Sequence, residues 1–233
     1  MSAYAAAGAC AVFLALVLGA YLFWRYVWFF RNPRRKIPAG ESILSPADGT
    51  VVYVKRLVEG EPAVSLKNGR SMEVGEIVRE HVEQPKMLVG IFMSPLNVHY
   101  NRTPLSGTVE SVVHSEPRTA NSHMGSMHWR CLLQRLPLYE NSPHLLSNER
   151  TVTKLRSMFK GGEMFLYLVQ IAGGSVRGID SFVRVGQEVR RGEVFGMIRV
   201  GSQVDLVCTR HANLRVRVRP GDKVKAGETI LMD

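Results

Sequence analysis

Residues 195–206 read FGMIRVGSQVDL, which is two short apolar runs separated by the Gly201-Ser202 step. Runs of this kind predict β-strands, and a glycine between them predicts a tight break. Glycine has no Cβ, so its carbonyl stays open to a neighbouring side chain. The Ser202 hydroxyl can attack that carbonyl if the turn is strained and a base lies nearby. An ordinary turn remains the alternative interpretation.

Two segments, one before this stretch and one after it, repeat one another. Residues 183–193 (VRVGQEVRRGE) and 218–228 (VRPGDKVKAGE) each contain a glycine turn, a valine and a Gly-Glu step at the same spacing. Further strand-like runs lie at 50–54, 87–92, 108–113 and 165–171. Helical periodicity is weak after residue 30. We therefore expect a mostly β (α+β) domain with few helices, similar to the barrel-sandwich hybrid of lipoyl and biotinyl carriers.

The N-terminal 30 residues predict a transmembrane helix. No charged side chain occurs from Met1 to Trp24, and the apolar run continues to Phe30 with only Arg25 interrupting it. About 20 apolar residues are enough to span a bilayer. Lys and Arg follow the run and do not precede it, which favours an uncleaved anchor and a cytoplasmic domain over a cleaved signal peptide.

The composition limits the kinds of partner that we expect the protein to bind. Thirty Lys and Arg against 20 Asp and Glu give a formal net charge of +10, which suits nucleic acid, an anionic membrane or an anionic substrate. Zinc-finger spacing, an RNP-like aromatic stretch and a basic helix are all missing, so we do not expect nucleic acid. The scattered Cys10, Cys131 and Cys208 form no CxxC pair and indicate a reducing compartment.

Residues 114–150 are irregular and leave two questions open. One set of apolar residues has partly helical spacing. We expect these residues to pack in the core, and the alternative is that they form a surface in contact with lipid. This set consists of Trp129, Leu132, Leu133, Leu136 and Leu138. A metallohydrolase site would need His114, His123 and His128, but their spacing matches no metal-ligand pattern, so no metal is predicted.

Five landmarks occur in a specific order along the chain: residues 29–33 (FFRNP), 45–49 (SPADG), 92–99 (FMSPLNVH), 148–150 (NER) and 192–205. With these landmarks the chain resembles the phosphatidylserine decarboxylase proenzymes in their short bacterial and archaeal form. The resemblance extends from about Phe29 to near the C-terminus. An anchored, basic protein also suits an enzyme that acts on an anionic lipid.

The resemblance implies a zymogen that makes its own pyruvoyl cofactor. Ser202 would attack the Gly201 carbonyl, and elimination would split the chain into residues 1–201 and 202–233. The former Ser202 would become an N-terminal pyruvoyl group, and the two chains would stay together as a heterodimer, with further oligomers left open. The group would form a Schiff base with phosphatidylserine, release carbon dioxide and leave phosphatidylethanolamine.

The resemblance also assigns roles to individual residues. Asp48 and His99 match family positions implicated in self-cleavage and catalysis, and an imidazole with a carboxylate suits proton removal from a serine. Without the resemblance, both would be read as turn residues. The longer bacterial enzymes carry a second histidine where this chain has Arg102, whose planar fork we expect to bind the lipid phosphate or the substrate carboxylate. Ser175 is the serine of a second Gly-Ser step, but its flanking residues match less well than those of Ser202.

These expectations give one organisation for the whole chain. It consists of an anchor (1–30), a linker (31–44) and a catalytic domain (45–233), in the inner (plasma) membrane with the domain facing the cytoplasm. Anionic membrane lipid is an expected partner of the catalytic domain. A membrane-anchored, lipoyl-like binding module without catalysis is the alternative, although neither repeat offers a lysine at a hairpin tip.

Overall fold

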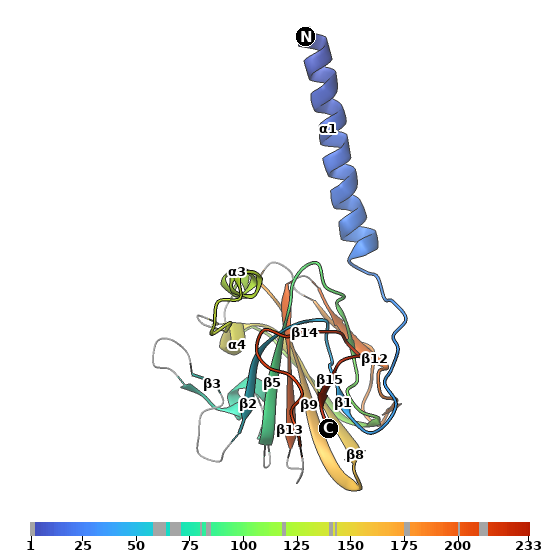
Figure 1. Cartoon of the computed structure of the whole chain (residues 1–233), viewed down its shortest axis with the longest axis vertical. Helices are drawn as coiled ribbons and strands as arrows, with labels where there is room; N and C mark the ends of the chain where they lie inside the picture. The colour runs from blue at the N-terminus through green and yellow to red at the C-terminus, as the bar shows by residue number, and fades with distance from the viewer. Residues whose placement is uncertain are drawn as a thin grey trace. The chain divides into compact units, whose positions relative to one another are not determined.

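The computed structural model describes residues 3–57, 64–65, 71–79, 81–82, 85–117, 120–139, 142, 144–174, 178–199, 201–209 and 214–233 (Figure 1). The chain divides into two compact units, residues 1–33 and 34–233. The first unit is helical, and the second contains the strands described below.

The first unit is one long apolar helix. Helix α1 (Ala3–Phe23) continues into a π-helical turn, η1 (Trp24–Trp28). Residues 6–28 contain an 18-residue window with a mean hydropathy of 2.2 and are long and apolar enough to cross a membrane, judged by length and composition. At 1.5 Å per residue they span about 35 Å, compared with about 30 Å of hydrocarbon in a bilayer. The aromatic rings gather at the helix end, where the Arg31 guanidinium lies 4.3 Å from the centre of the Trp28 ring, as is typical of a membrane interface.

The second unit is organised by an eight-stranded antiparallel sheet with the order β11-β7-β8-β9-β13-β5-β2-β14. Its strands are β2 (Gly49–Arg56), β5 (Pro85–Met93), β7 (Gly107–Ser115), β8 (Arg150–Phe159), β9 (Gly162–Ile171), β11 (Glu188–Val189), β13 (Ser202–Thr209) and β14 (Lys223–Val224). All eight residues of β13 are buried, because both faces of the sheet are covered at its centre.

Each face of the sheet has its own hydrophobic core. Val204 and Leu206 of β13 point into one core, whereas Val207 points into the other, as the two-residue period of a strand requires. The first core is covered by β10 (Ile179–Ser181), β12 (Val194–Ile198) and β6 (Tyr100–Arg102) in one small sheet, and by β1 (Ile43–Leu44) with β15 (Ile230–Met232) in another.

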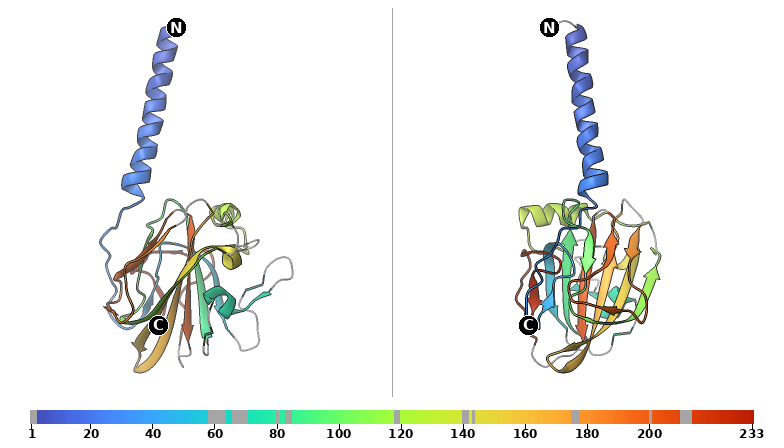
Figure 2. Two further views of the ribbon diagram at one scale, coloured as in Figure 1. Left: turned by 180° about the vertical axis from the view of Figure 1, so that it is seen from behind. Right: turned by 90° about the vertical axis from the view of Figure 1, so that its right-hand side faces the viewer.

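Three helices contribute to the second core, through residues such as Ile77, Met127 and Leu145. They are α2 (Val74–Val78), α3 (Gly125–Leu133) and α4 (His144–Ser147). A separate pair of short strands, β3 (Val64–Ser65) and β4 (Ser71–Met72), lies outside the large sheet. In the right-hand view of Figure 2 the strands of the large sheet run side by side, with α3 at one end.

The repeated C-terminal segments form the two edges of the sheet. β11 belongs to the first repeat and pairs with β7, whereas β14 belongs to the second and pairs with β2. The glycines of both repeats have positive φ angles, which favour glycine. The partner strands repeat as well, because residues 45–51 (SPADGTV) and 103–109 (TPLSGTV) enter β2 and β7 in the same way. The prediction of a mostly β domain with an N-terminal apolar helix is confirmed.

We predict that the full-length protein stays in the membrane fraction after salt and carbonate washing, because residues 6–28 bind hydrocarbon rather than charge. The control is the double variant Leu14→Arg/Leu18→Arg, since each arginine costs about 2.5–3.5 kcal/mol at the centre of a spanning helix. Fractionation followed by immunoblotting measures both proteins. Wild-type chain of full length in the carbonate supernatant would contradict a spanning helix.

Candidate active site

Ser202 is the first residue of β13 and pairs with Met93, the last residue of β5. Its side chain is fully buried, and its hydroxyl donates to the Met93 Sδ at 3.5 Å. A thioether is a weak acceptor, so this hydrogen bond holds the hydroxyl only loosely. Gly201 has φ +56°, in the left-handed region that most residues with a Cβ avoid. The predicted break between two strands is therefore present at Gly201, next to a buried serine.

One loop carries His99 towards this step. The loop 94–99 leaves β5 opposite Ser202 and enters β6, which pairs with β12. At its far end, the Ile198 N–H donates to the His99 carbonyl at 3.2 Å. Both ends of this loop are thus hydrogen-bonded to the strands on either side of residues 199–201, which explains how residues about 100 positions apart meet.

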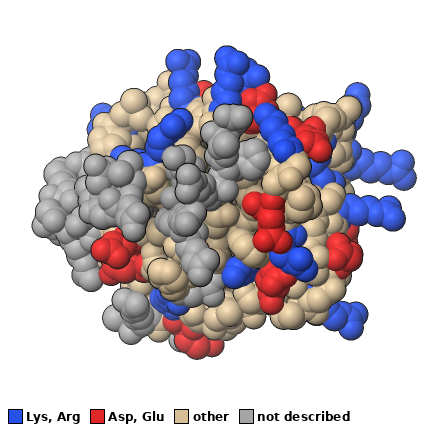
Figure 3. All heavy atoms as spheres, turned by 90° about the horizontal axis from the view of Figure 1, so that it is seen from below, with Lys and Arg blue, Asp and Glu red and all other residues tan. Residues whose placement is uncertain are grey.

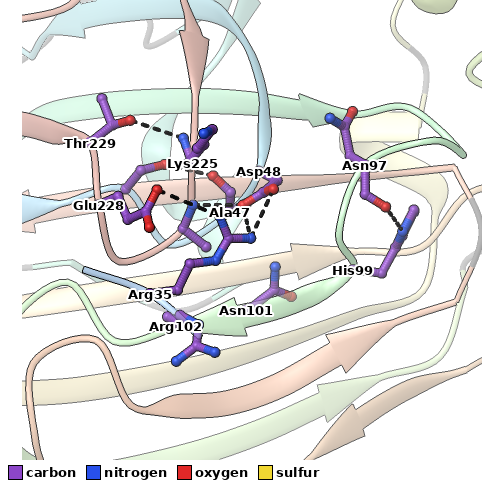
Figure 4. Close-up of polar contacts among 12 residues, drawn as sticks. Arg35, Ala47, Asp48, Asn97, His99, Asn101, Arg102, Lys225, Glu228 and Thr229 are labelled. Atoms are coloured by element: carbon purple, nitrogen blue, oxygen red, sulfur yellow. Dashed lines mark hydrogen bonds and ion pairs between the residues drawn. The ribbon is translucent and has the colours of Figure 1, made fainter. Parts of the chain in front are cut away.

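The orientation of the His99 ring follows from its hydrogen bond to Asn97 (Figure 4). The His99 Nδ1 lies 2.9 Å from the Asn97 carbonyl oxygen. A carbonyl only accepts, so Nδ1 carries a proton and Nε2 holds the lone pair of the neutral ring. Asn97 itself is fixed by a turn in which the Ser94 N–H and hydroxyl donate to its Oδ1. The ring therefore has the tautomer that a general base using Nε2 requires.

Asp48 lies at the same end of the sheet and binds other groups. The Arg35 guanidinium donates to both its carboxylate oxygens, at 2.9 and 3.0 Å, and the Ala226 N–H donates at 2.7 Å. β2 and β13 flank β5, so at about 4.8 Å per strand Asp48 lies roughly 10 Å from Ser202. In Figure 4 the bonds of Asp48 and the bond of His99 go to different partners. The roles of Asp48 and His99 in self-cleavage and catalysis stay predictions.

Arg102 lies beside the Asp48 group. Its guanidinium donates to the Gly192 carbonyl at 2.8 Å, and burial together with the nearby Arg35 lowers its pKa from the ordinary value. Arg102 is labelled next to Arg35 in Figure 4, away from His99. Its predicted role in binding an anion stays a prediction.

Asn101 and Gln170 are two polar residues near Ser202 that the sequence analysis missed. Both are fully buried. The Asn101 Nδ2 donates to the same Met93 sulfur as Ser202 does, at 3.6 Å, and the Gln170 Nε2 donates to the Asn101 Oδ1 at 2.8 Å. The Gln170 Oε1 has no hydrogen-bond partner among the described residues. The sequence signal for this pair was Gln170, an amide side chain inside the apolar run 165–171, because a buried polar side chain usually needs hydrogen-bond partners.

A second polar network lies on the opposite face of β13. The Tyr53 hydroxyl donates to Asp205 at 2.6 Å, and the Gln203 amide donates to Asp205 at 2.6 Å and to Tyr53 at 2.8 Å. The His144 Nε2 lies 3.1 Å from the Gln203 Oε1. Burial raises the pKa of Asp205 to about 6 and lowers that of His144 to about 4. This network is next to Ser202 in sequence but faces the other core.

The landmark 148–150 fixes the loops at this end of the sheet. Arg150 is fully buried and donates to the carbonyls of Ile77 and Leu145, each at 2.7 Å. The Asn148 amide donates to the Ala172 carbonyl at 2.8 Å. These bonds tie α2 and α4 to the ends of β8 and β9, and Arg150 pairs across the sheet with Ile171, which is opposite Gln203.

The remaining candidates are placed as follows. Ser175 lies outside the described residues, so the choice between the two Gly-Ser steps is not decided by geometry. His114 contacts Thr151 and Glu149, and the His128 ring packs edge-to-face against Phe92. Within the described part of the chain, no group of three or more His, Cys, Asp or Glu side chains is arranged to hold a metal ion. Cys10, Cys131 and Cys208 are free thiols.

Comparison with known proteins identifies the family. The phosphatidylserine decarboxylase profile matches residues 22–232. A protein of Methanocaldococcus jannaschii, provisionally named an archaetidylserine decarboxylase proenzyme, is 34% identical over 206 residues, which cover 88% of this chain and 87% of the relative. The phosphatidylserine decarboxylase proenzymes of Syntrophus aciditrophicus and Chlorobium limicola are 34% and 32% identical over 88% and 93% of this chain, and over 77% and 82% of their own lengths.

These matches span both the turn at Gly201 and the loop that carries His99. The protein is a decarboxylase built on a mostly β domain. It belongs to the phosphatidylserine decarboxylase family, as the sequence resemblance predicted.

We predict that Asp48→Ala and Arg35→Ala each lower the free energy of unfolding by about 3 kcal/mol, because each leaves one charge of a buried ion pair unpaired. The two side chains are 12% and 6% exposed. The double variant should cost clearly less than the sum of the two single changes. Denaturant unfolding of the full chain in detergent micelles measures this coupling, and strictly additive losses would show that the pair is not coupled.

We also predict a pH-dependent effect of Asp205→Asn. The folded pKa of Asp205, about 6, lies above its ordinary 3.8, so its stabilisation is complete below pH 3.8 and is lost as the pH rises through 6. The variant avoids this loss and should gain up to about 3 kcal/mol relative to the wild type between pH 4 and pH 7.

Unfolding midpoints of the two proteins across this pH range give the difference curve. Asp180→Asn is the matched control, because that carboxylate pairs with Arg199 at the surface. A difference curve for Asp205→Asn as flat as that of the control would refute the buried-carboxylate assignment.

Proposed function

We propose that the protein converts phosphatidylserine to phosphatidylethanolamine with a pyruvoyl group made from its own Ser202. The observation that carries the proposal is the position of Ser202, which is fully buried at the start of β13, directly after a left-handed glycine. The name of proenzyme that several relatives carry supports a chain that processes itself.

Self-cleavage begins with the Ser202 hydroxyl. Its Oγ attacks the carbonyl carbon of Gly201, the peptide C–N bond breaks, and an ester bond to Oγ replaces it. The hydroxyl gives up only a weak hydrogen bond to Met93 when it turns towards the carbonyl. Because Gly201 has no Cβ, no side chain shields its carbonyl.

His99 is the proposed base for this step. Its Nδ1 donates to Asn97, so Nε2 can accept the proton of the Ser202 hydroxyl. Asp48 acts as a positioning residue in this proposal. Its bonds to Arg35 and Ala226 fix the start of β2 beside the end of β5, where the His99 loop begins.

Elimination then divides the chain. A base removes the α-hydrogen of residue 202, and the ester leaves as the new carboxylate of Gly201. Water replaces the nitrogen of residue 202, which departs as ammonia, and a ketone remains at the start of the smaller chain. The products 1–201 and 202–233 stay together, because β13 lies between β5 and β9 and is buried along its whole length.

The surroundings of Ser202 suit such a group. The chemistry that such a group would supply is a ketone for the substrate amine and an acceptor for the electrons that remain when carbon dioxide leaves. Gln170, whose buried Oε1 has no partner in the described part of the chain, can accept a hydrogen bond from the amine. His99 can return one proton to the substrate carbon. Arg102 remains the proposed partner of the lipid phosphate or carboxylate, which requires its bond to the Gly192 carbonyl to be exchanged.

The proposal includes the location of the enzyme. The apolar helix would anchor it in the inner (plasma) membrane, with Arg31, Arg34, Arg35 and Lys36 on the cytoplasmic side. In this arrangement residues 1–30 are the anchor, 31–44 the linker and 45–233 the catalytic domain. Anionic lipid would then surround the domain that consumes it.

We predict that purified wild-type protein consists of two chains, 1–201 and 202–233, whereas Ser202→Ala remains one folded, inactive chain, because alanine lacks the nucleophile. Intact mass spectrometry measures the chains, and reaction with a hydrazine detects the ketone on the smaller one. His99→Ala should slow cleavage by roughly 100-fold or more, the usual contribution of a general base. Active wild-type enzyme in a single chain would refute the proposal.

The matched control is Ser175→Ala, which should be cleaved normally. Loss of cleavage in Ser175→Ala, together with normal cleavage in Ser202→Ala, would move the site to the other Gly-Ser step. Release of carbon dioxide from phosphatidylserine and from archaetidylserine, compared in one preparation, identifies the lipid backbone that the enzyme prefers.

A further inference from the structure

Helix α3 and the turn after it expose an apolar surface that the fold does not use. Trp129, Leu132, Leu133 and Leu136 are 61%, 62%, 54% and 68% exposed, and we call them the α3 patch. The sequence analysis expected this set to pack in the core. That expectation is wrong for these four residues and correct for Leu138, which is 1% exposed.

The exposure results from how α3 packs. Met127 and Cys131 bury one side of the helix in the second core, so the opposite side faces outward. The helix therefore has apolar residues on two sides, one packed in the second core and one exposed. Large contiguous apolar surfaces on a soluble domain usually mark a binding site.

The charges around the α3 patch suit an anionic surface. Residues 120–139 contain no Asp or Glu, but they contain Arg130 and Arg135. By contrast, the opposite end of the domain, shown in Figure 3, mixes Lys and Arg with Asp and Glu. A short helix with tryptophan and leucine on its outer side and arginine nearby is typical of helices that lie in the interface of a membrane.

The connection between the apolar helix and the second unit is short, which limits how far the second unit can lie from a membrane that the helix spans. Five residues separate Trp28, the end of the apolar helix, from Arg34, the start of the second unit. At 3.3–3.6 Å per residue, the connection reaches at most about 20 Å. If the helix spans a membrane, the domain cannot leave its surface, and even a weakly apolar patch is presented to lipid at a high effective concentration.

The α3 patch also lies at the end of the sheet that holds Ser202. The His128 ring of α3 packs against the Phe92 ring at 6.2 Å between centroids, and Phe92 is followed by Met93, the pairing partner of Ser202. Figure 1 shows α3 at one end of the large sheet and the β8–β9 hairpin at the other. A membrane bound by α3 would therefore lie near the candidate site.

We propose that the α3 patch docks the domain onto the surface of an anionic membrane, as a second contact besides the N-terminal helix. The proposal rests on the proposed function only in that the substrate is then a membrane lipid. Docking would bring the Ser202 end of the sheet to the headgroups, so that a lipid reaches the site without leaving the bilayer completely.

The test uses the full-length protein in vesicles whose lipids carry bromine on the acyl chains. The variant Trp24→Phe/Trp28→Phe leaves Trp129 as the only tryptophan, because the chain has three. An interfacial helix places its apolar side about 5–10 Å into the headgroup and acyl boundary, so the emission of Trp129 should fall by roughly half. Adding Leu132→Ser and Leu136→Ser, or omitting anionic lipid, should restore most of the emission.

A matched control moves the probe to the other end of the sheet. Met158 is 65% exposed near the β8–β9 hairpin, and the variant Met158→Trp with all three native tryptophans changed to Phe should not be quenched by brominated lipid. Quenching of Trp129 by aqueous iodide and not by brominated lipid would overturn the proposal. Protection of Trp129 from both quenchers, with cross-linked dimers, would also overturn it and assign the patch to a second copy of the chain.

Failure of docking is distinguishable from failure of the proposed function, because quenching requires no turnover. A protein that is cleaved at Ser202 while Trp129 stays in water loses only the docking proposal. An uncleaved protein whose Trp129 is quenched by brominated lipid retains docking and loses the pyruvoyl mechanism.

Discussion

The pairing of β13 with β5, which sets Ser202 opposite Met93, is the contact on which the rest of the domain depends. β13 is hydrogen-bonded on its other side to β9, and all its residues are buried. Its first residue, Ser202, pairs with β5 alone, and from Gln203 onward the strand is paired on both sides. If the chain is cleaved before Ser202 as proposed, the strand stays paired, because the hydrogen bonds that hold it lie after the cleavage point.

The polar network on the opposite face fixes the register of that pairing. A slip of one residue would turn Gln203 and Asp205 into the first core, away from Tyr53 and His144. An ionisable carboxylate without its partners in an apolar core is costly. The raised pKa of Asp205 shows that burial already opposes its ionised form. We infer that the network stabilises one register, and hence the placement of Ser202, more than it adds to overall stability.

Sequence patterns predicted the parts of this structure that depend on neighbouring residues. The apolar N-terminal helix, the strand alternation and the glycine turns of the two repeats all follow from short-range rules. The placement of the His99 loop between the end of β12 and the start of β13 depends on the strand order, which no local pattern contains. The exposure of Trp129 and Leu132 was missed for a related reason, since helical spacing shows that a helix has an apolar side but not whether a core covers it.

The repeat also clarifies what is special about Asp48. The Ser106 hydroxyl occupies the equivalent position and accepts the Arg191 N–H at 2.9 Å, as Asp48 accepts the N–H of Ala226. Holding this turn therefore requires only a polar side chain. A carboxylate adds negative charge, and the structure balances that charge with the nearly buried Arg35. Since the turn alone does not explain a buried ion pair, the reason for an aspartate lies in the contact with the segment that begins at Arg35, or in the chemistry at this end of the sheet.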